Sequence, residues 1–322
     1  MSYKNNRYDR KRININIIVT LVLVTILGVA IYLSPETFSE ASQKIIKYTK
    51  NIIDKEEVSE ENDYTDEIEI ASDIAEVHFL DVGEGDSTLI ISDGKTMLID
   101  GGSKIYGDDI VKRLNELGIE KIDYLVGTHP HEDHIGGLYK VIDNFEIGEM
   151  ILPAITTNTW TFENMLDSLL KKDIEVSSPE VGTTFYVGKC KCEIMLIGDG
   201  SEDEKFDLNL SSIVIRMEYG NISYLFTGDA ILANEESREW PETTVLRVAH
   251  HGSSSSSSEA FLNQVKPQIS VISCGKNNDY GHPKLSVLNR LQRYGKIYRT
   301  DESGEIIIKT DGNKIEVKLE RE

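Results

Sequence analysis

The histidine-rich segment at residues 128–137, THPHEDHIGG, constrains the fold of this chain more than any other stretch. It contains three imidazoles and a carboxylate within six residues: His129, His131, Asp133 and His134. Their spacing does not match one face of a helix, but it suits a tight loop around a metal ion. Apolar residues 124–126 precede the loop like a buried strand, and helical periodicity follows from Leu138. Because α/β sheets place their sites between a strand end and a helix start, the segment predicts a metal-binding loop in an α/β domain.

The other histidines support a shared site. Six of the seven fall into three groups, each just past a predicted strand: His129, His131 and His134; His250 and His251; and His282. His78, inside a predicted strand, is expected to pack without a functional role. Neutral imidazole and carboxylate together suit zinc, manganese or iron. A chance cluster of surface histidines is the alternative, but it would not explain three groups at strand ends.

The N-terminal region carries a separate signal. Residues 13–33 are overwhelmingly apolar and close to the ~20 residues that cross a bilayer. Five basic residues and one acid precede them, which predicts a single-pass membrane anchor with the rest of the chain outside the cytoplasm. Secretion after cleavage of a signal peptide is the alternative, but no clear A-x-A site follows the apolar run. The predicted segments are a cytoplasmic tail (1–12), an anchor (13–33), a stalk with an acidic linker (34–75) and a globular domain (76–322).

The globular domain shows alternating strand and helix patterns with hairpins among them, which predicts a mixed α/β fold. We expect a helix over residues 235–240 and a mobile loop over the serine run at residues 253–258. The three cysteines are too few and too unevenly spaced for a disulfide framework. Cys190 and Cys192 are expected to be two half-buried thiols on one face of a strand, rather than a metal clip.

Several short motifs together resemble the metallo-β-lactamase superfamily, and most closely the nuclease-like domain of the ComEC/Rec2 competence proteins. The motifs are LDVGEGD at 80–86, LIDGG at 98–102, the HxHxDH loop, TGD at 227–229, HHGS at 250–253, YGHP at 280–283 and YRTD at 298–301. Only their combination, which extends from about residue 76 to the C-terminus, is specific. The resemblance implies a four-layer αβ/βα sandwich that carries a two-metal hydrolase site and uses no organic cofactor.

The resemblance also implies a role for each motif residue. His129 and His131 would bind one divalent ion, zinc or manganese; Asp133, His134 and His282 would bind a second; and Asp229 would bridge the two. The metals would activate a shared water for attack on a phosphorus or carbonyl centre. Asp133, His250 and His251 are the candidate catalytic residues. Adjacent side chains of an extended chain point in opposite directions, so one of the last two is expected to face the metals, as a general acid or a phosphate contact.

Four further residues complete the predicted site: Asp86 and Asp100, which would orient ligands, and Asn209 and Ser253. Ser253 could hydrogen-bond a phosphate. The superfamily's usual third histidine of the first metal site is missing, because no histidine occurs between Ile135 and Ala249. Asn209 lies in the corresponding segment. The first site is therefore expected to bind its metal more weakly or to select manganese.

The distribution of charge supports two opposing expectations about a DNA substrate. The net charge is −21, and residues 76–322 alone contain 25 basic and 42 acidic side chains, which opposes long-range attraction of DNA. Residues 247–299, however, contain eight basic and two acidic side chains, which predicts either a basic lip beside the site or a solvated helix face.

Three hypotheses follow. The leading one is a membrane-anchored, extracytoplasmic phosphodiesterase acting on DNA. The first alternative is a hydrolase of the same fold for a small molecule or a cell-wall ester, and the second is a non-catalytic binding scaffold.

Overall fold

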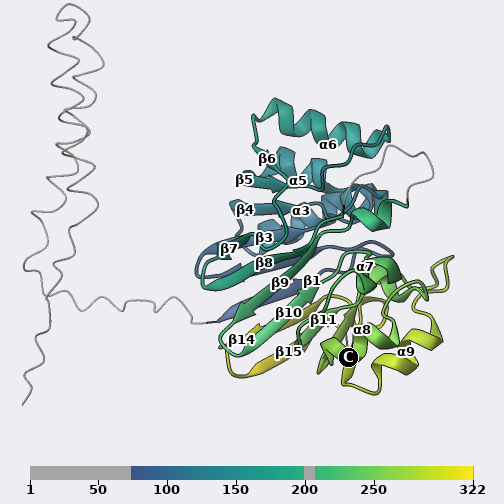
Figure 1. Cartoon of the computed structure of the whole chain (residues 1–322). Coiled ribbons are helices and arrows are strands. Elements are labelled where there is room, and N and C mark those ends of the chain that lie inside the picture. Colours follow the sequence, from purple (N-terminus) through teal and green to yellow (C-terminus); the bar gives the residue numbers. More distant parts are fainter. Residues whose placement is uncertain (1–73, 199–206, 322) are drawn as a thin grey trace, which may run out of the picture. The chain divides into compact units, whose positions relative to one another are not determined.

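The computed structural model of the chain describes residues 74–198 and 207–321, which contain two mixed β-sheets (Figure 1). The first sheet has eight strands in the order β15-β14-β1-β2-β3-β4-β5-β6. Their bounds are β1 Ala75–Phe79, β2 Thr88–Ser92, β3 Lys95–Ile99, β4 Lys121–Val126, β5 Glu146–Ile151, β6 Val176–Ser177, β14 Ile306–Thr310 and β15 Ile315–Leu319. The second sheet has seven strands in the order β13-β12-β11-β10-β9-β8-β7. Their bounds are β7 Thr184–Val187, β8 Cys190–Leu196, β9 Val214–Tyr219, β10 Ile222–Phe226, β11 Val245–Arg247, β12 Ile269–Ile272 and β13 Lys296–Arg299.

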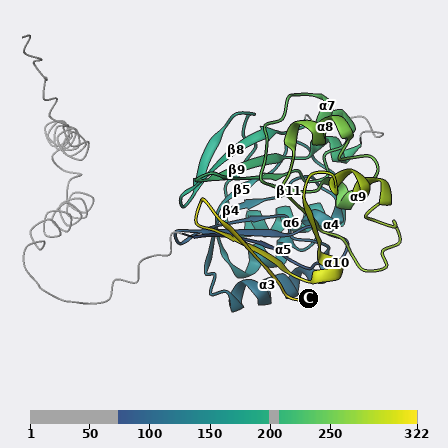
Figure 2. The ribbon, with the colours of Figure 1, turned by 90° about the horizontal axis from the view of Figure 1, so that it is seen from below.

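Helices cover the outer faces of the sheets, with α3, α5 and α6 on one side and α8 and α9 on the other (Figures 1 and 2). The α-helices are α3 Gly107–Glu116, α4 Glu132–Ile135, α5 Leu138–Asn144, α6 Trp160–Lys171, α7 Leu232–Glu236, α8 Glu259–Val265, α9 Leu285–Leu291 and α10 Thr300–Ser303. Short 3₁₀ helices are η2 Lys104–Tyr106, η3 Leu208–Ser211 and η4 Ala249–Gly252.

Three hydrophobic cores lie between these layers. The middle core joins the two sheets, for example through Phe79 of β1 and Phe226 of β10, whose ring centroids are 6.5 Å apart. A second core packs the first sheet against α3, α5 and α6, and a third packs the second sheet against α8 and α9. The described residues therefore form the helix–sheet–sheet–helix order that the sequence predicts. Cys190 and Cys192 lie fully buried in the middle core rather than half-buried, and burial raises the pKa of the Cys192 thiol.

Parallel strands bring the predicted site loops to common edges. Strands β3 to β6 run parallel in the first sheet, and β10 to β13 run parallel in the second. The loops with Asp100 and the histidine motif follow β3 and β4, whereas those with Asp229 and the adjacent histidine pair follow β10 and β11. Because the carboxyl ends of neighbouring parallel strands share an edge, each sheet collects its polar side chains in one place.

Two local predictions are wrong. The helix expected at residues 235–240 lies instead at Leu232–Glu236, because the Trp240 indole turns back to donate to the Glu235 carbonyl (2.8 Å). The serine run is a packed turn rather than a mobile loop: Ser256 and Ser257 are buried, and the Glu235 carboxylate accepts hydrogen bonds from the amides of Ser257 and Ser258. A carboxylate 22 residues away cannot be recognised as the partner of a serine run from the sequence.

None of the helices in the described ranges has the length and apolar character needed to cross a bilayer. The predicted cytoplasmic tail, the predicted anchor at residues 13–33 and nearly all of the predicted stalk lie outside the described residues.

Candidate metal centre

Backbone hydrogen bonds from two neighbouring loops hold the histidine loop in place. The Gly101 amide after β3 donates to the His134 carbonyl (2.6 Å), and the Asp86 amide after β1 donates to the Asp133 carbonyl (3.1 Å). The approach requires glycine at position 85, because a Cβ there would lie 2.4 Å from the Asp133 carbonyl oxygen. Three separate motifs of the sequence thus meet at one loop.

The buried carboxylate of Asp229, just after β10, lies at the centre of the site. Its Oδ1 atom is 3.2 Å from Nε2 of His134. Its Oδ2 atom is 3.5 Å from Nε2 of His251, 3.9 Å from Nε2 of His250 and 4.0 Å from Nε2 of His129. Four imidazoles therefore converge on one carboxylate, which is the position that a bridging ligand requires.

Ring nitrogens in the site also face one another. His129 Nε2 is 3.0 Å from His131 Nδ1, and His134 Nε2 is 3.3 Å from His251 Nε2. The donor atoms within each of three overlapping groups lie within 4.8 Å of one another: His129, His134 and Asp229; Asp133, His134 and His251; and Asp86, Asp100 and His134. Imidazole nitrogen and carboxylate oxygen are ligands for zinc and manganese, so this donor set fits a two-metal site.

The electrostatics of the cluster favour a cation. Burial lowers the pKa of His129 well below its ordinary value, so this imidazole is neutral, as a metal ligand must be. Burial alone would also lower the pKa of His251, but Asp229 and Asp133 raise it to about 9. Likewise burial would raise the pKa of Asp229, yet His134 and His251 hold it well below the usual range. The Asp229 carboxylate is thus ionised and draws positive charge toward the centre.

Both residues of the adjacent histidine pair face the site, so the expectation that only one would do so is wrong. It assumed an extended backbone, but η4 holds His250 at φ 52° and His251 at φ 51°, in the left-handed region. His251 is buried and its Nδ1 lies 3.0 Å from the Ser273 carbonyl, whereas His250 is partly exposed and its Nδ1 lies 3.0 Å from Ser255 Oγ. His251 is therefore placed as a metal ligand, and His250 lies at the opening of the site.

A pocket of about 250 Å³, here called the central pocket, opens over the cluster of histidines and Asp229. It is lined by Glu84, His131, Glu132, Asp133, Asp229, His250, His251, Tyr280 and His282. Segments separated by up to about 200 positions in the sequence therefore meet at one opening.

A family model of the metallo-β-lactamase superfamily matches residues 80–276, and this range holds the histidine loop, Asp229 and the adjacent histidine pair. The chain belongs to the metallo-β-lactamase superfamily. Its described fold has the α/β architecture with two mixed sheets, and its His/Asp cluster is typical of a two-metal site of this superfamily.

Three curated relatives are proteins of bacterial competence and recombination. ComE operon protein 3 of Bacillus subtilis is 28% identical over 72% of this chain and 32% of its own length. Recombination protein 2 of Haemophilus influenzae is 29% identical over 76% of this chain and 30% of its own length. Competence protein ComA of Neisseria gonorrhoeae is 32% identical over 72% of this chain and 32% of its own length. The chain thus spans about a third of the length of the curated relatives it matches.

Within the superfamily site, His282 lies further out than the sequence assigns it. It lines the pocket, and its ring centroid is 6.4 Å from that of His251, but it joins none of the three compact donor groups among the described residues. Its Nδ1 is 3.2 Å from Oε1 of Glu84, whose Oε2 accepts a hydrogen bond from the Gly275 amide (3.0 Å). Glu84, which belongs to the motif at residues 80–86 but was given no role from the sequence, thus positions His282; an acid between two glycines after a strand was the available signal.

The predicted orienting carboxylates lie behind the ligands. Asp100 is fully buried, and its Oδ2 is 2.7 Å from His134 Nδ1 and accepts the Thr128 hydroxyl hydrogen bond at 2.7 Å. Asp86 accepts a hydrogen bond from Ser273 Oγ (2.9 Å) and forms an ion pair with Arg247 (2.7 Å). Asp100 therefore fixes the orientation of an imidazole, whereas Asp86 acts on the site through the groups around it.

The segment that replaces the missing superfamily histidine lies next to the histidine loop, since the Ile213 amide donates to the Thr128 carbonyl (2.9 Å). Asn209 is buried there, and its Oδ1 has no hydrogen-bond partner among the described residues. Ser212, which the sequence analysis did not single out, accepts a hydrogen bond from the Asp229 amide (3.2 Å). Ser253 does not contact the donor cluster; its hydroxyl pairs with that of Ser255 (3.0 Å).

The predicted basic lip does not line the pocket. Its first member, Arg247, is buried beneath the site, where it contacts Asp86 and lies 3.6 Å from Asp229 Oδ1. Arg293 pairs with Glu259, and Arg299 pairs with Asp301. The residues around the pocket include four carboxylates but neither lysine nor arginine. A charge count along the sequence cannot tell a buried arginine from an exposed one.

Proposed function

We propose that this chain is a metal-dependent phosphodiesterase whose polymer substrate is DNA. The convergence of four imidazoles on the buried Asp229 carboxylate supports the metallo-hydrolase part of this proposal. The name of one relative, Recombination protein 2, connects that protein with recombination, a process that acts on DNA. The similarity to it favours DNA over other phosphodiesters.

The donor groups and the contact between His129 and His131 suggest the ligand roles. His129, His131 and Asp229 would hold one divalent ion, and Asp133, His134 and His251 would hold the other, with His282 at the outer side of the pocket. When bound, such ions supply Lewis acidity and lower the pKa of a water molecule. Asp100 keeps the His134 ring in the orientation in which Nε2 faces the site.

His250 is the group we assign to proton transfer. It is the partly exposed member of the pair, its Nε2 faces Asp229, and Ser255 fixes its other ring nitrogen. Burial lowers its pKa below the ordinary histidine value, so the ring, once protonated, gives up its proton more readily than a free imidazole. A ring held in this way at the opening of the pocket can pass a proton to the departing oxygen of a phosphodiester.

We also propose that residues 13–33 anchor the chain in the cell membrane with the domain on the outer side. The apolar length and the preceding basic residues support this topology.

The test uses the full-length chain in detergent, freed of metal and reloaded with manganese or zinc. We expect metal-dependent degradation of DNA, which His131→Ala and Asp229→Ala abolish. Asp167→Ala, an exposed change on α6, is the matched control and should degrade DNA like the parent chain. Intact DNA with both metals would contradict the proposal.

A second candidate is a hydrolase for a small molecule or a cell-wall ester. The acidic lining of the pocket favours it, because four carboxylates disfavour a polyanion. Activity confined to small diesters or thioesters would select this function. Failure of the purified chain to bind any metal would instead support a binding scaffold.

A further inference from the structure

A second groove, here called the serine-run groove, opens beside His250. It has a volume of about 460 Å³, within the ~300–1,000 Å³ range of ligand sites. It is lined by Ile231, Leu232, Ser254, Ser255, Ser256, Ser258, Glu259 and Arg290. Ser255 connects it to the metal centre, because its hydroxyl contacts His250 at 3.0 Å and His250 lines the central pocket. The serine-run groove therefore lies next to the central pocket, on the side of His250.

One wall of the groove offers a cation and hydroxyls. Arg290 of α9 donates from Nε to the Ser257 carbonyl (2.8 Å) and from Nη2 to the Ser256 carbonyl (3.2 Å), which leaves Nη1 without a hydrogen-bond partner among the described residues. Glu259 is neutralised by Arg293 (2.7 Å). Arg290 also interacts with the buried Glu235 carboxylate, so its free Nη1 group gives this wall a charged hydrogen-bond donor, which the central pocket lacks, rather than an unpaired charge.

The apolar wall of the groove consists of Ile231 and Leu232. Leu232 is 45% exposed, although it is a large aliphatic side chain. Its amide donates to the Ser255 carbonyl (2.9 Å), and Ser256 Oγ donates to the Ala230 carbonyl (2.8 Å), so hydrogen bonds join this segment to the serine run. The groove thus combines an apolar surface with a guanidinium and hydroxyls.

We propose that the serine-run groove binds the nucleotide next to the scissile phosphodiester, with its phosphate at Arg290 and its base against Leu232. The proposal rests on the phosphodiesterase function above and adds a subsite to it. A nucleotide has both an anion and a flat apolar group, which matches the two walls. A glycerol phosphate unit of a wall polymer has only the anion, so it would use Arg290 and not Leu232.

The first experiment measures binding without cleavage. The full-length chain in detergent, with EDTA, is titrated against a fluorescein-labelled short single-stranded DNA, and anisotropy gives Kd at fixed salt. We expect Arg290→Gln to weaken binding roughly 10-fold through loss of a charge-assisted contact. Leu232→Ser should weaken it about 3- to 5-fold through loss of apolar contact. Lys296→Gln, which removes an exposed cation at the start of β13 outside the groove lining, is the control and should stay within about 2-fold.

The second experiment separates the groove from the catalytic centre. Hydrolysis of bis(4-nitrophenyl) phosphate by the manganese-loaded chain should keep the same kcat/KM in Lys296→Gln, whereas KM for the oligonucleotide should rise in Arg290→Gln and Leu232→Ser. Unchanged DNA affinity in either variant overturns the proposal. So does equal competition by poly(glycerol phosphate), which would assign the groove to a wall polymer. Failure of the proposed function is a different result, in which the parent chain cleaves no phosphodiester while the EDTA titrations still report on the groove.

Discussion

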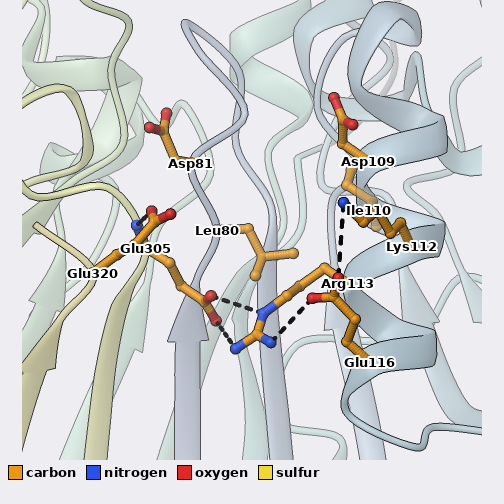
Figure 3. Close-up of a pocket in the computed structure, with 9 residues that line it drawn as sticks. All are labelled: Leu80, Asp81, Asp109, Ile110, Lys112, Arg113, Glu116, Glu305 and Glu320. Carbon is orange, nitrogen blue, oxygen red and sulfur yellow. Dashed lines mark hydrogen bonds and ion pairs between the residues drawn. The ribbon is translucent and has the colours of Figure 1, made fainter.

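Two pockets of the domain carry several carboxylates, yet they differ in what neutralises them. The central pocket contains four carboxylates and four histidines, and the Arg113 pocket, about 200 Å³, lies near α3 (Figure 3). The Arg113 pocket is lined by Leu80, Asp81, Asp109, Ile110, Lys112, Arg113, Glu116, Glu305 and Glu320. In it, Glu305 accepts hydrogen bonds from Arg113 Nε (2.8 Å) and Nη2 (3.2 Å) and lies 2.7 Å from His78 Nδ1, and Asp81 pairs with Arg321 (2.6 Å).

The basic residues that line each pocket, rather than the number of acids, separate the two: the central pocket has only histidines, and the Arg113 pocket has only lysine and arginine. Arginine stays charged at all ordinary pH values and cannot bind a metal, so the Arg113–Glu305 pair is a closed structural contact. Imidazole can give up its proton and present a lone pair, so carboxylates paired with histidines can exchange that proton for a metal ion. The comparison assigns metal binding to the central pocket and stability to the Arg113 pocket, and each variant below tests one side of it.

The largest effect is expected from Asp229→Asn. An amide in this position has one oxygen and no charge, so it cannot replace the carboxylate on which the four imidazoles converge. Direct ligands should exceed the ~10–100-fold effect of the groups behind them, so we expect metal affinity to fall by more than about 100-fold. Competition with a chromophoric chelator measures the affinity of the stripped chain. Retention of tight binding at both metal sites would contradict the assignment.

Asp100→Asn should have the next largest effect. The change weakens the contact that orients His134 without removing a proposed ligand, and such changes lower metal affinity by about 10–100-fold. The same chelator competition measures it. Asp123→Asn, which loosens a contact with Lys95 at the far end of the strands, is the control and should leave metal affinity unchanged.

Glu305→Gln should leave metal affinity unchanged and lower the free energy of unfolding by about 1.5–3 kcal/mol, because it weakens hydrogen bonds to a charged group. Burial would raise the pKa of Glu305, but His78 and Arg113 lower it below the usual value. A lowered folded-state pKa gives stability that is present above the unfolded pKa and lost as pH falls through the folded pKa. Urea unfolding at pH 7 and near pH 3.5 should therefore show the difference between parent and variant shrinking in acid.

Glu116→Ala should have the smallest effect. Glu116 lies 3.5 Å from Arg113 Nη1, but its side chain is half exposed, and such surface pairs contribute ~0–1 kcal/mol. We expect urea unfolding within about 0.5 kcal/mol of the parent chain. A loss as large as that of Glu305→Gln would show that the Arg113 pocket works as one network rather than as a buried pair with an exposed addition.

The part of the site that is continuous in sequence could be predicted well. The histidine loop, the strand before it and the acid after β10 are marked by local patterns, and these residues meet in the structure. The order of layers also followed from the motifs, because their combination is specific to one superfamily. These features depend on short-range periodicity and on residue types that have few other uses in a buried loop.

Features that depend on backbone conformation or on distant partners could not be predicted. The direction of His251 depends on a left-handed turn that contains no glycine at that position. The burial of Arg247 depends on Asp86, which lies on the other sheet's loop, and the order of the serine run depends on Glu235. In each case a long-range contact overrides the local preference of the residue.

His250 and His251, which follow β11 with a left-handed backbone, limit how stable this domain can become. For L-residues this conformation costs roughly 1–2 kcal/mol per residue, and glycine would adopt it more readily. Selection for a more robust domain would therefore favour glycine at positions 250 and 251, while the chemistry we propose demands imidazole at both. The most durable version of this domain and its most active version cannot share the same sequence there.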